Sequence, residues 1–293
     1  MTSTDWNLPD VSTLCGQLEA ACLLEAAAPK AGNVHPGASF ADLNFSDFVT
    51  SARVASHILA KTREVGVGKS IRLAAEATYN AVGKNTNLGI LLLLGPLAAV
   101  PSTQDLKPGI KSVLDALTVE DSREVFVAIR CLTPGGMGNV DQQDVFREPT
   151  QPLVDIMQLA ANRDSVARQY VTGFHDVLTF GVDSLRRWTA GGADWQTAIV
   201  GSQLDWLAAH PDTLIARKLG VDHAHQASHQ AKAVLASGWP HTDAARHQFL
   251  GFDAWLRADG HKRNPGTTAD LIAAAVFVML RKGYWTKSNF TSY

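Results

Sequence analysis

The stretch from Pro29 to Asp47 gathers side chains of several chemical kinds in one short segment: Lys30, Asn33, His35, Asp42 and Asp47. Lysine ammonium groups bind phosphate, and carboxylates bind Mg²⁺ or accept protons. We therefore expect a phosphate contact from Lys30 and a metal or base role for Asp42 and Asp47. The alternative is an ordinary interhelical loop with solvated charges.

A second polar segment, Gly83-Lys84-Asn85-Thr86-Asn87-Leu88-Gly89, leads into a strongly apolar run. Free backbone N–H groups and the macrodipole make the start of a helix an anion site. The segment lacks the spacing of a P-loop, so it predicts a phosphate-binding helix entry of another kind. Asn85 or Thr86 could equally serve as an ordinary helix N-cap.

A third segment runs from His261 to Asp270 and precedes another apolar run. Its first three residues can all carry positive charge, which would suit a polyphosphate: His261, Lys262 and Arg263. Thr267 and Asp270 have the spacing of a capping box, in which Asp270 would be structural.

Two further charged pairs are weaker candidates. Arg217 and Lys218 are adjacent near the end of an expected helix, where they could bind an anion or form a solvated face. Asp164 and Arg168 are four residues apart, and the spacing predicts a surface ion pair on one helix.

Helical periodicity runs through nearly the whole sequence, with no alternation typical of strands. We expect an all-α, single globular domain, spanning residues 1–293, of roughly ten or more packed helices. Ser46 and Thr118 with Asp121 are the expected N-terminal caps, and Trp285 to Tyr293 is expected to be a loose tail. The expected helices cover residues 11–28, 47–61, 67–81, 88–100, 118–131, 153–180, 194–209, 212–236, 241–258 and 267–282.

Composition excludes several classes of protein. The 293 residues carry 26 basic and 28 acidic side chains, so no overall field attracts nucleic acid or an anionic membrane. The apolar run from Leu88 to Val100 is too short to span a bilayer, which needs about 20 residues. Three cysteines without a disulfide pattern, and no signal peptide, predict a soluble cytoplasmic protein.

The three segments, in this order, resemble the triphosphoribosyl-dephospho-CoA synthase family. The resemblance extends from about residue 14 to residue 282, and it rests on three motifs: Ala28-Pro29-Lys30-Ala31-Gly32-Asn33-Val34, Asn85-Thr86-Asn87-Leu88-Gly89 and Asn264-Pro265-Gly266-Thr267-Thr268-Ala269-Asp270-Leu271.

The resemblance implies an all-α fold and a reaction in which the 2′-hydroxyl of dephospho-CoA attacks C1′ of the ATP ribose and adenine leaves. Asp42 and Asp270 are then the candidates for the base or a metal ligand, and Asp42 and Asp47 for holding the Mg²⁺ that accompanies ATP. The residues expected to contact phosphate or other parts of the substrates are Lys30, Asn33, His35, Asn85, Thr86, Asn87, Arg217, Lys218, Arg263 and Asn264.

This sequence departs from the family pattern at several positions. Asn87 and Leu88 stand where a histidine and a lysine are expected, Ala31 replaces a proline, and His35-Pro36 replaces an acidic residue. The loop from residue 134 to 144 resembles a divergent branch found in organisms with pterin-linked one-carbon carriers.

Three functions therefore remain open. The first is transfer of a phosphorylated ribosyl group from a nucleotide to dephospho-CoA or a related acceptor. The second is biosynthesis of a one-carbon carrier such as a methanopterin- or methanofuran-like cofactor. The third is a non-catalytic nucleotide-binding or scaffold protein. The expected partners are nucleotide and dephospho-CoA-like small molecules, with no nucleic acid and no membrane, and an oligomer is possible.

Overall fold

Helices form nearly all the regular structure in residues 7–133 and 142–290, the part of the chain that the computed structural model describes. Within that part, the extended structure consists of two isolated bridges, His35 with Ala38 and Phe40 with Leu43. The expected all-α class is confirmed. The α-helices are α1 (Leu14–Ala27), α2 (Phe45–Leu59), α3 (Thr62–Val65), α4 (Val67–Val82), α5 (Leu88–Ala99), α6 (Leu106–Asp115), α7 (Val119–Leu132), α8 (Leu153–Ala160), α9 (Ser165–Thr172), α10 (Val182–Ala190), α11 (Trp195–Ala209), α12 (Thr213–Leu219), α13 (Val221–Ala236), α14 (Asp243–Arg257) and α15 (Gly266–Arg281).

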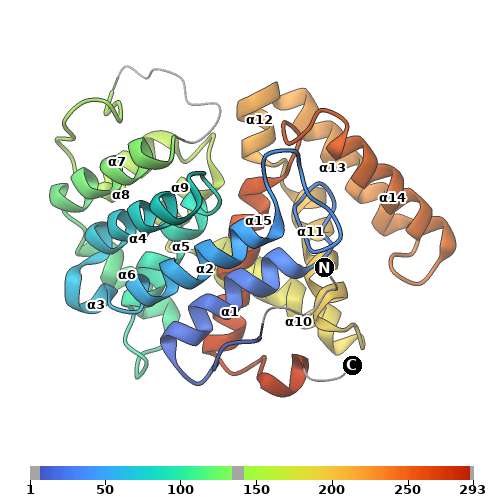
Figure 1. Ribbon diagram of the computed structural model, residues 1–293, viewed down its shortest axis with the longest axis horizontal. Helices are drawn as coiled ribbons and strands as arrows, with labels where there is room; N and C mark the ends of the chain where they lie inside the picture. Colours follow the sequence, from blue (N-terminus) through green and yellow to red (C-terminus); the bar gives the residue numbers. More distant parts are fainter. Residues whose placement is uncertain (1–6, 134–141, 291–293) are drawn as a thin grey trace.

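Two helices that are apolar on every face form the centre of the molecule. Helix α15 is buried continuously from Leu271 to Leu280, and α5 is buried over nearly its whole length despite Pro96 inside it. A helix without a polar face must be enclosed by others. Helix α15 packs against α1, α5 and α11, and it runs through the middle of the view in Figure 1.

A second group of helices lies beside α15. Helices α11, α12, α13 and α14 pack against one another through a separate apolar cluster that includes Leu207, Ile215, Val234 and Phe252. In Figure 1 this group and the group α7 to α9 lie on opposite sides of α15. Within the described residues no helix, α5 included, has the length and hydropathy needed to cross a bilayer.

Several predicted boundaries are wrong for identifiable reasons. The expected helix 153–180 is divided into α8, α9 and a short π-helix, Val177–Gly181, because Asp164 caps a new start and Gly173 takes a left-handed conformation with φ 64°. Likewise the expected helix 212–236 is broken at Gly220, where φ is 93°. Helix α6 was not expected, because Pro108 and Gly109 interrupt the helical pattern.

Capping residues also differ in part from the prediction. Thr118 and Asp121 form the expected capping box of α7. Helix α2, however, is capped by Asn44 with Asp47, and Ser46 only donates a hydrogen bond to the Asn44 side chain over 2.6 Å.

The end of the described chain is packed rather than loose. The Trp285 ring is buried, and its indole N–H donates to Thr189 Oγ1 over 3.2 Å. A 3₁₀ turn, Lys287–Phe290, then brings the Phe290 ring against Trp195 and Trp285.

Candidate functional site

A cavity of about 1210 Å³ lies between the two groups of helices. Its walls come from α5, α7, α8 and α9 on one side and from α12, α13 and the start of α15 on the other, and α1 and the loop before α2 contribute further residues. All three polar segments of the sequence reach it. The predicted site residues that line it are Asn33, Asp42, Asn85, Thr86, Asn87, Arg217, Lys218, Asn264 and Asp270.

Asp270 is the carboxylate with the most unusual surroundings. It lines the cavity from the second turn of α15, and within residues 7–133 and 142–290 it has no hydrogen-bond or ion-pair partner. Burial, followed by the negative charges of Glu25 and Asp212, raises the pKa of Asp270 well above its ordinary value. The side chain therefore has a strong affinity for a proton.

Gly89 gives Asp270 the space it occupies. A Cβ atom at position 89 would lie 2.0 Å from Asp270 Oδ2, so the carboxylate sits directly against the first turn of α5. This contact joins the second and third motifs of the sequence at one point. It also explains why glycine follows Leu88 at a helix start where no unusual φ angle demands one.

The predicted capping box of α15 is wrong, and its failure leaves Asp270 facing the cavity. Asp212 takes the capping role instead, because its Oδ2 accepts hydrogen bonds from the Thr268 N–H and hydroxyl, each over 2.8 Å. Through Oδ1, Asp212 also caps α12 by accepting from the Leu214 and Ile215 N–H groups. One buried carboxylate thus fixes the starts of both helices.

The wall formed by α9 and α12 carries most of the positive charge. Arg217 pairs with Asp164 over 3.2 Å, and the guanidinium of Arg168 pairs with Asp176 over 3.0 Å. The expected Asp164–Arg168 pair is therefore wrong, because Asp164 turns back to cap α9. Arg163 also lines this wall. Together these cations are placed to attract a polyanion.

Lys218 and the third motif form the adjoining part of the wall. The ammonium of Lys218 donates to the His261 carbonyl over 3.1 Å and to Asn264 Oδ1 over 3.3 Å. Burial lowers the pKa of Lys218. His261 Nε2 lies 3.3 Å from the carboxylate of Asp42, whose side chain is 66% exposed.

The second motif is held by local hydrogen bonds. Asn85 Oδ1 accepts from the Leu88 N–H over 3.1 Å, and the Thr86 hydroxyl lies 2.5 Å from that of Ser51. Asn87 Nδ2 donates to Thr78 Oγ1 over 3.2 Å, and its Oδ1 is buried without a hydrogen-bond partner in the described part of the chain. The predicted N-cap at Asn85 or Thr86 is nevertheless wrong, because Asn87 holds the N-cap position of α5 and its side chain makes no capping hydrogen bond.

Lys30 is not among the described residues that line the cavity, contrary to the prediction of a phosphate contact. Its ammonium is fully buried, lies 2.8 Å from Glu25 Oε1 and donates to the Glu25 carbonyl oxygen at the end of α1. Carbonyl groups in the last turn of a helix lack helical partners, so a lysine that folds back satisfies one of them.

Arg263 and Asp47 also have partners elsewhere. Arg263 lies over the Trp255 ring at 4.7 Å and donates to the Trp255 carbonyl over 2.8 Å, which places it at the end of α14. The carboxylate of Asp47 accepts from the Asn44 N–H and pairs with Lys84, each over 3.0 Å. The structure therefore offers no support for a phosphate contact from Arg263 or for Asp47 as a metal ligand.

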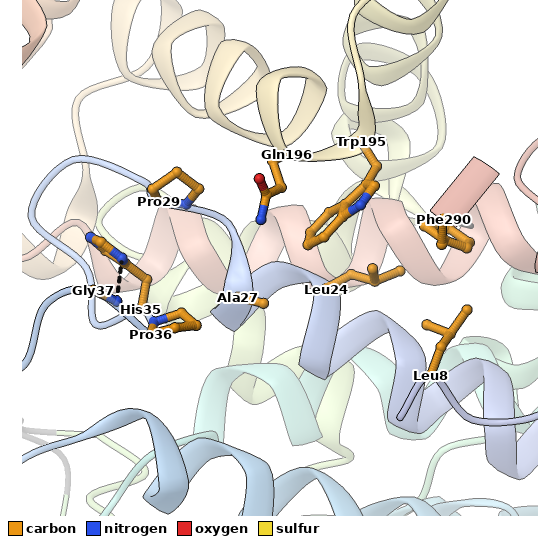
Figure 2. A pocket seen from close by; sticks show the side chains of 10 residues that line it. All are labelled: Leu8, Leu24, Ala27, Pro29, His35, Pro36, Gly37, Trp195, Gln196 and Phe290. Carbon is orange, nitrogen blue, oxygen red and sulfur yellow. Dashed lines mark hydrogen bonds between the residues drawn. The ribbon is translucent and has the colours of Figure 1, made fainter. Parts of the chain in front are cut away.

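His35 lines a separate, smaller pocket of about 410 Å³ (Figure 2). Trp195, Phe290 and Leu24 supply much of its apolar wall. His35 Nδ1 accepts from the Gly37 N–H over 3.1 Å. Burial, then the charges of Arg257 and Lys30, lowers the pKa of His35 to about 4, so the ring is neutral at pH 7.

Glu25, Arg163 and His210 line the cavity but were not singled out from the sequence, and Arg168 was assigned only to a surface ion pair. Burial, followed by the charge of Arg168, lowers the pKa of His210, which keeps that ring neutral. Arg163 and Arg168 lie on either side of Asp164, which caps α9. A helix start with basic residues on both sides resembles the other motifs, and this signal could have identified the two arginines. Part of the 134–144 loop, residues 134–141, lies outside the described residues.

The fold has a counterpart of known structure. A protein of Archaeoglobus fulgidus, provisionally assigned as a triphosphoribosyl-dephospho-CoA synthase, superimposes with a TM-score of 0.62 over 80% of this chain and 99% of its own. The two sequences are 23% identical, so the likeness concerns the fold.

Sequence comparison is more specific. A Pseudomonas putida protein described as "Probable 2-(5''-triphosphoribosyl)-3'-dephosphocoenzyme-A synthase" is 35% identical over 107 residues, which are 36% of this chain and 37% of that protein's length. The matched region thus spans well under two thirds of that relative. A family model described as ATP:dephospho-CoA triphosphoribosyl transferase matches residues 12–289. The chain belongs to the ATP:dephospho-CoA triphosphoribosyl transferase family.

Proposed function

We propose that this protein transfers the triphosphoribosyl group of ATP to the 2′-hydroxyl of dephospho-CoA and releases adenine. The observation that carries the proposal is Asp270, a carboxylate without a protein partner in the described chain, in a cavity with a cationic wall. The reaction needs both features, a proton acceptor at the reacting hydroxyl and cations for the triphosphate.

In this proposal the triphosphate lies along α9 and α12. Arg217 and Arg168 already face carboxylates, and the triphosphate oxygens would replace part of those contacts. Lys218 would exchange its weak contact with the Asn264 amide for a phosphate oxygen. Asn264 would then be free to contact the ribose or the acceptor.

The bond changes balance as follows. The hydroxyl oxygen of dephospho-CoA forms a bond to C1′ of the ATP ribose, and the C1′–N9 bond breaks with its electron pair going to adenine. The hydroxyl proton passes to Asp270 and then, directly or through water, to the departing adenine, so that Asp270 is ionised again and no proton is gained or lost. A transition state with oxocarbenium character would be stabilised by the negative charge of Glu25 and by that of Asp270 before the proton is transferred.

Mg²⁺ enters this proposal as part of the MgATP substrate. Among the described residues no group of three or more His, Cys, Asp or Glu side chains is arranged to hold a metal ion. Mg²⁺ that is bound mainly by phosphate oxygens and water needs only one or two protein carboxylates. Asp42 is the carboxylate we assign to it, because it is exposed at the cavity and, among the described residues, its partner is His261.

The test is incubation of the purified protein with ATP, Mg²⁺ and dephospho-CoA, followed by chromatography for free adenine and for the joined product. We expect adenine only when dephospho-CoA is present, and none with Asp270→Asn. Calorimetric ATP binding without adenine release would exclude dephospho-CoA as the acceptor. Absence of both binding and release would favour a non-catalytic role.

A further inference from the structure

One wall of the main cavity carries no ionisable side chain in the described part of the chain. The lining residues between positions 125 and 160 belong to α7, α8 and the loop that joins them, and all are apolar except Thr133, Gln142 and Gln143. The wall formed by α9 and α12 instead carries Arg168, Arg217 and their neighbours. The cavity therefore has two unlike parts, one cationic and one uncharged.

The apolar side chains of the uncharged wall are not all covered by the protein. Ile156 and Leu159 are three residues apart on α8, so they lie on the same face of that helix. Leu159 is 41% exposed, and Ile156 is half-buried. Ile129, on the neighbouring helix α7, also lines the cavity and is half-buried. Covering apolar surface of this kind is favourable, so the wall suits an uncharged segment of a ligand.

The cationic and uncharged parts meet at the end of α8. Arg163 Nη1 donates to the Leu159 carbonyl over 3.0 Å, and both residues line the cavity. A guanidinium group therefore lies beside the apolar face formed by Ile156 and Leu159. A ligand in which an anionic group is followed by a long uncharged chain would match this order of side chains.

The acceptor of the proposed reaction has that order of groups. Dephospho-CoA is adenosine 5′-diphosphate extended by pantetheine, a chain that is uncharged at neutral pH and contains two amide groups. ADP has the same 2′-hydroxyl and the same diphosphate, so neither group can distinguish dephospho-CoA from ADP. An enzyme that selects dephospho-CoA must therefore recognise the pantetheine arm.

We propose that the pantetheine arm of dephospho-CoA lies along the uncharged wall, against Ile129, Ile156 and Leu159, with the acceptor's diphosphate next to Arg163. This wall then determines the choice of acceptor, and the inference rests on the proposed function. The cavity volume of about 1210 Å³ exceeds the roughly 300–1,000 Å³ of a site for one small ligand, which leaves room for the arm beside the nucleotide.

The experiment measures acceptor binding without turnover. The protein is first saturated with Mg²⁺ and carbocyclic ATP, in which a methylene group replaces the ribose ring oxygen and prevents the oxocarbenium ion. Dephospho-CoA or ADP is then added, and the Kd is measured by calorimetry. We expect the wild type to bind dephospho-CoA at least about tenfold more tightly than ADP. Ile156→Ala/Leu159→Ala should weaken dephospho-CoA binding about tenfold, because less apolar surface is covered, and should leave ADP binding unchanged.

Val154→Ala is the matched control. Val154 is also a half-buried, branched apolar residue of α8, but it packs against the core and is not among the residues lining the cavity. Its truncation should leave both Kd values unchanged. In turnover assays, Ile156→Ala/Leu159→Ala should raise the KM for dephospho-CoA about tenfold with a nearly normal kcat, since the arm is distant from the reacting hydroxyl.

Equal Kd values for dephospho-CoA and ADP in the wild type would overturn the inference. So would equal losses for both ligands in the double variant. Should the double variant fail to fold, Leu159→Ser replaces it, because that side chain is 41% exposed and its loss disturbs the core least. We then expect a loss of about threefold for dephospho-CoA and none for ADP.

The inference and the proposed function can fail separately. Adenine release that depends on dephospho-CoA but is insensitive to Ile156 and Leu159 would contradict the inference alone. Tight binding of dephospho-CoA that depends on these two residues, without adenine release from ATP, would support the arm site and contradict the proposed function alone. No binding of dephospho-CoA would contradict both.

Discussion

At the scale of single residues, the surroundings of Asp270 determine both its affinity for a proton and its effect on the free energy of unfolding. The pKa of this carboxyl is raised in the folded protein, so folding is opposed at any pH where the unfolded chain would ionise it. This destabilisation is absent below about pH 3.8, grows as the pH rises toward the folded pKa, and is constant above it.

Asp270→Asn should therefore stabilise the protein at pH 7 and above while it removes activity. We expect the midpoint temperature of unfolding to rise, and the rate of adenine release to fall by about 10²–10⁴-fold, the usual contribution of a general base. In the wild type, kcat/KM should fall as the pH drops through the raised pKa, above the usual range of aspartate. A variant with near-normal activity would exclude Asp270 as the base.

Gly89→Ala tests the position of the same carboxylate without changing its charge. The added Cβ would overlap Asp270 Oδ2, and the end of a flexible side chain can move away at little cost in stability. Alanine also favours helix by up to about 1 kcal/mol. We expect activity to fall by about 100-fold, because a displacement of one ångström has that effect on positioned groups, with stability nearly unchanged.

Gly251→Ala serves as the control, since it lies within α14 with no atom near the added methyl. It should leave adenine release unaltered. Equal losses in the two variants would show that the substitution acts through helix propensity and not through Asp270.

Individual charges were visible in the sequence, but their partners were not. Arg217, Lys218 and Asp270 line the cavity as the motifs suggested. Lys30 and Arg263 instead fold back on the ends of α1 and α14. Whether a side chain can do so depends on the direction in which the backbone leaves the helix. Sequence spacing gives no access to that direction.

At the scale of elements, the joint between α12 and α15 determines how the cavity wall is held. Asp212→Ala would leave two N-terminal N–H groups of α12, and the Thr268 N–H and hydroxyl, without their acceptor. We expect a loss of roughly 2–4 kcal/mol in the free energy of unfolding, measured by denaturant titration. Thr268→Val removes a single hydrogen bond and should cost about 1 kcal/mol. If both variants unfold alike, Asp212 does not join the two helices.

Apolar periodicity located the helices well, but it did not locate the interruptions between them. The strongest segments, such as α5 and α15, match the expected ranges within about two residues. The break between α8 and α9 depends on a cap at Asp164 that competes with a surface ion pair, and that competition is decided by Arg217 from another helix.

At the scale of the whole molecule, the size of the cavity bears on the order of binding. Its volume of about 1210 Å³ exceeds the roughly 300–1,000 Å³ typical of a site for one small ligand. We expect MgATP and dephospho-CoA to bind together, so that double-reciprocal plots at several fixed dephospho-CoA concentrations intersect. Parallel lines, with adenine released from ATP alone, would indicate a covalent ribosyl-enzyme instead.

The cavity itself was beyond sequence reasoning, although the motifs that line it were found. It lies between α7 to α9 and α12 to α13, which are distant in sequence and are brought together by α15. Glu25 belongs to it only because α1 packs on that central helix.

The cavity's cations already have internal counter-charges, and this affects which ligands can enter. Before any substrate binds, the guanidinium groups of Arg217 and Arg168 are already paired with Asp164 and Asp176, respectively. We therefore expect an anion to bind this wall only if it carries enough charge to displace the carboxylates of Asp164 and Asp176. A nucleoside monophosphate carries less negative charge than a triphosphate, so we expect it to displace fewer of these contacts. Preference for the triphosphate would then follow from competition with the protein's own carboxylates. No residue would need to contact the end of the phosphate chain.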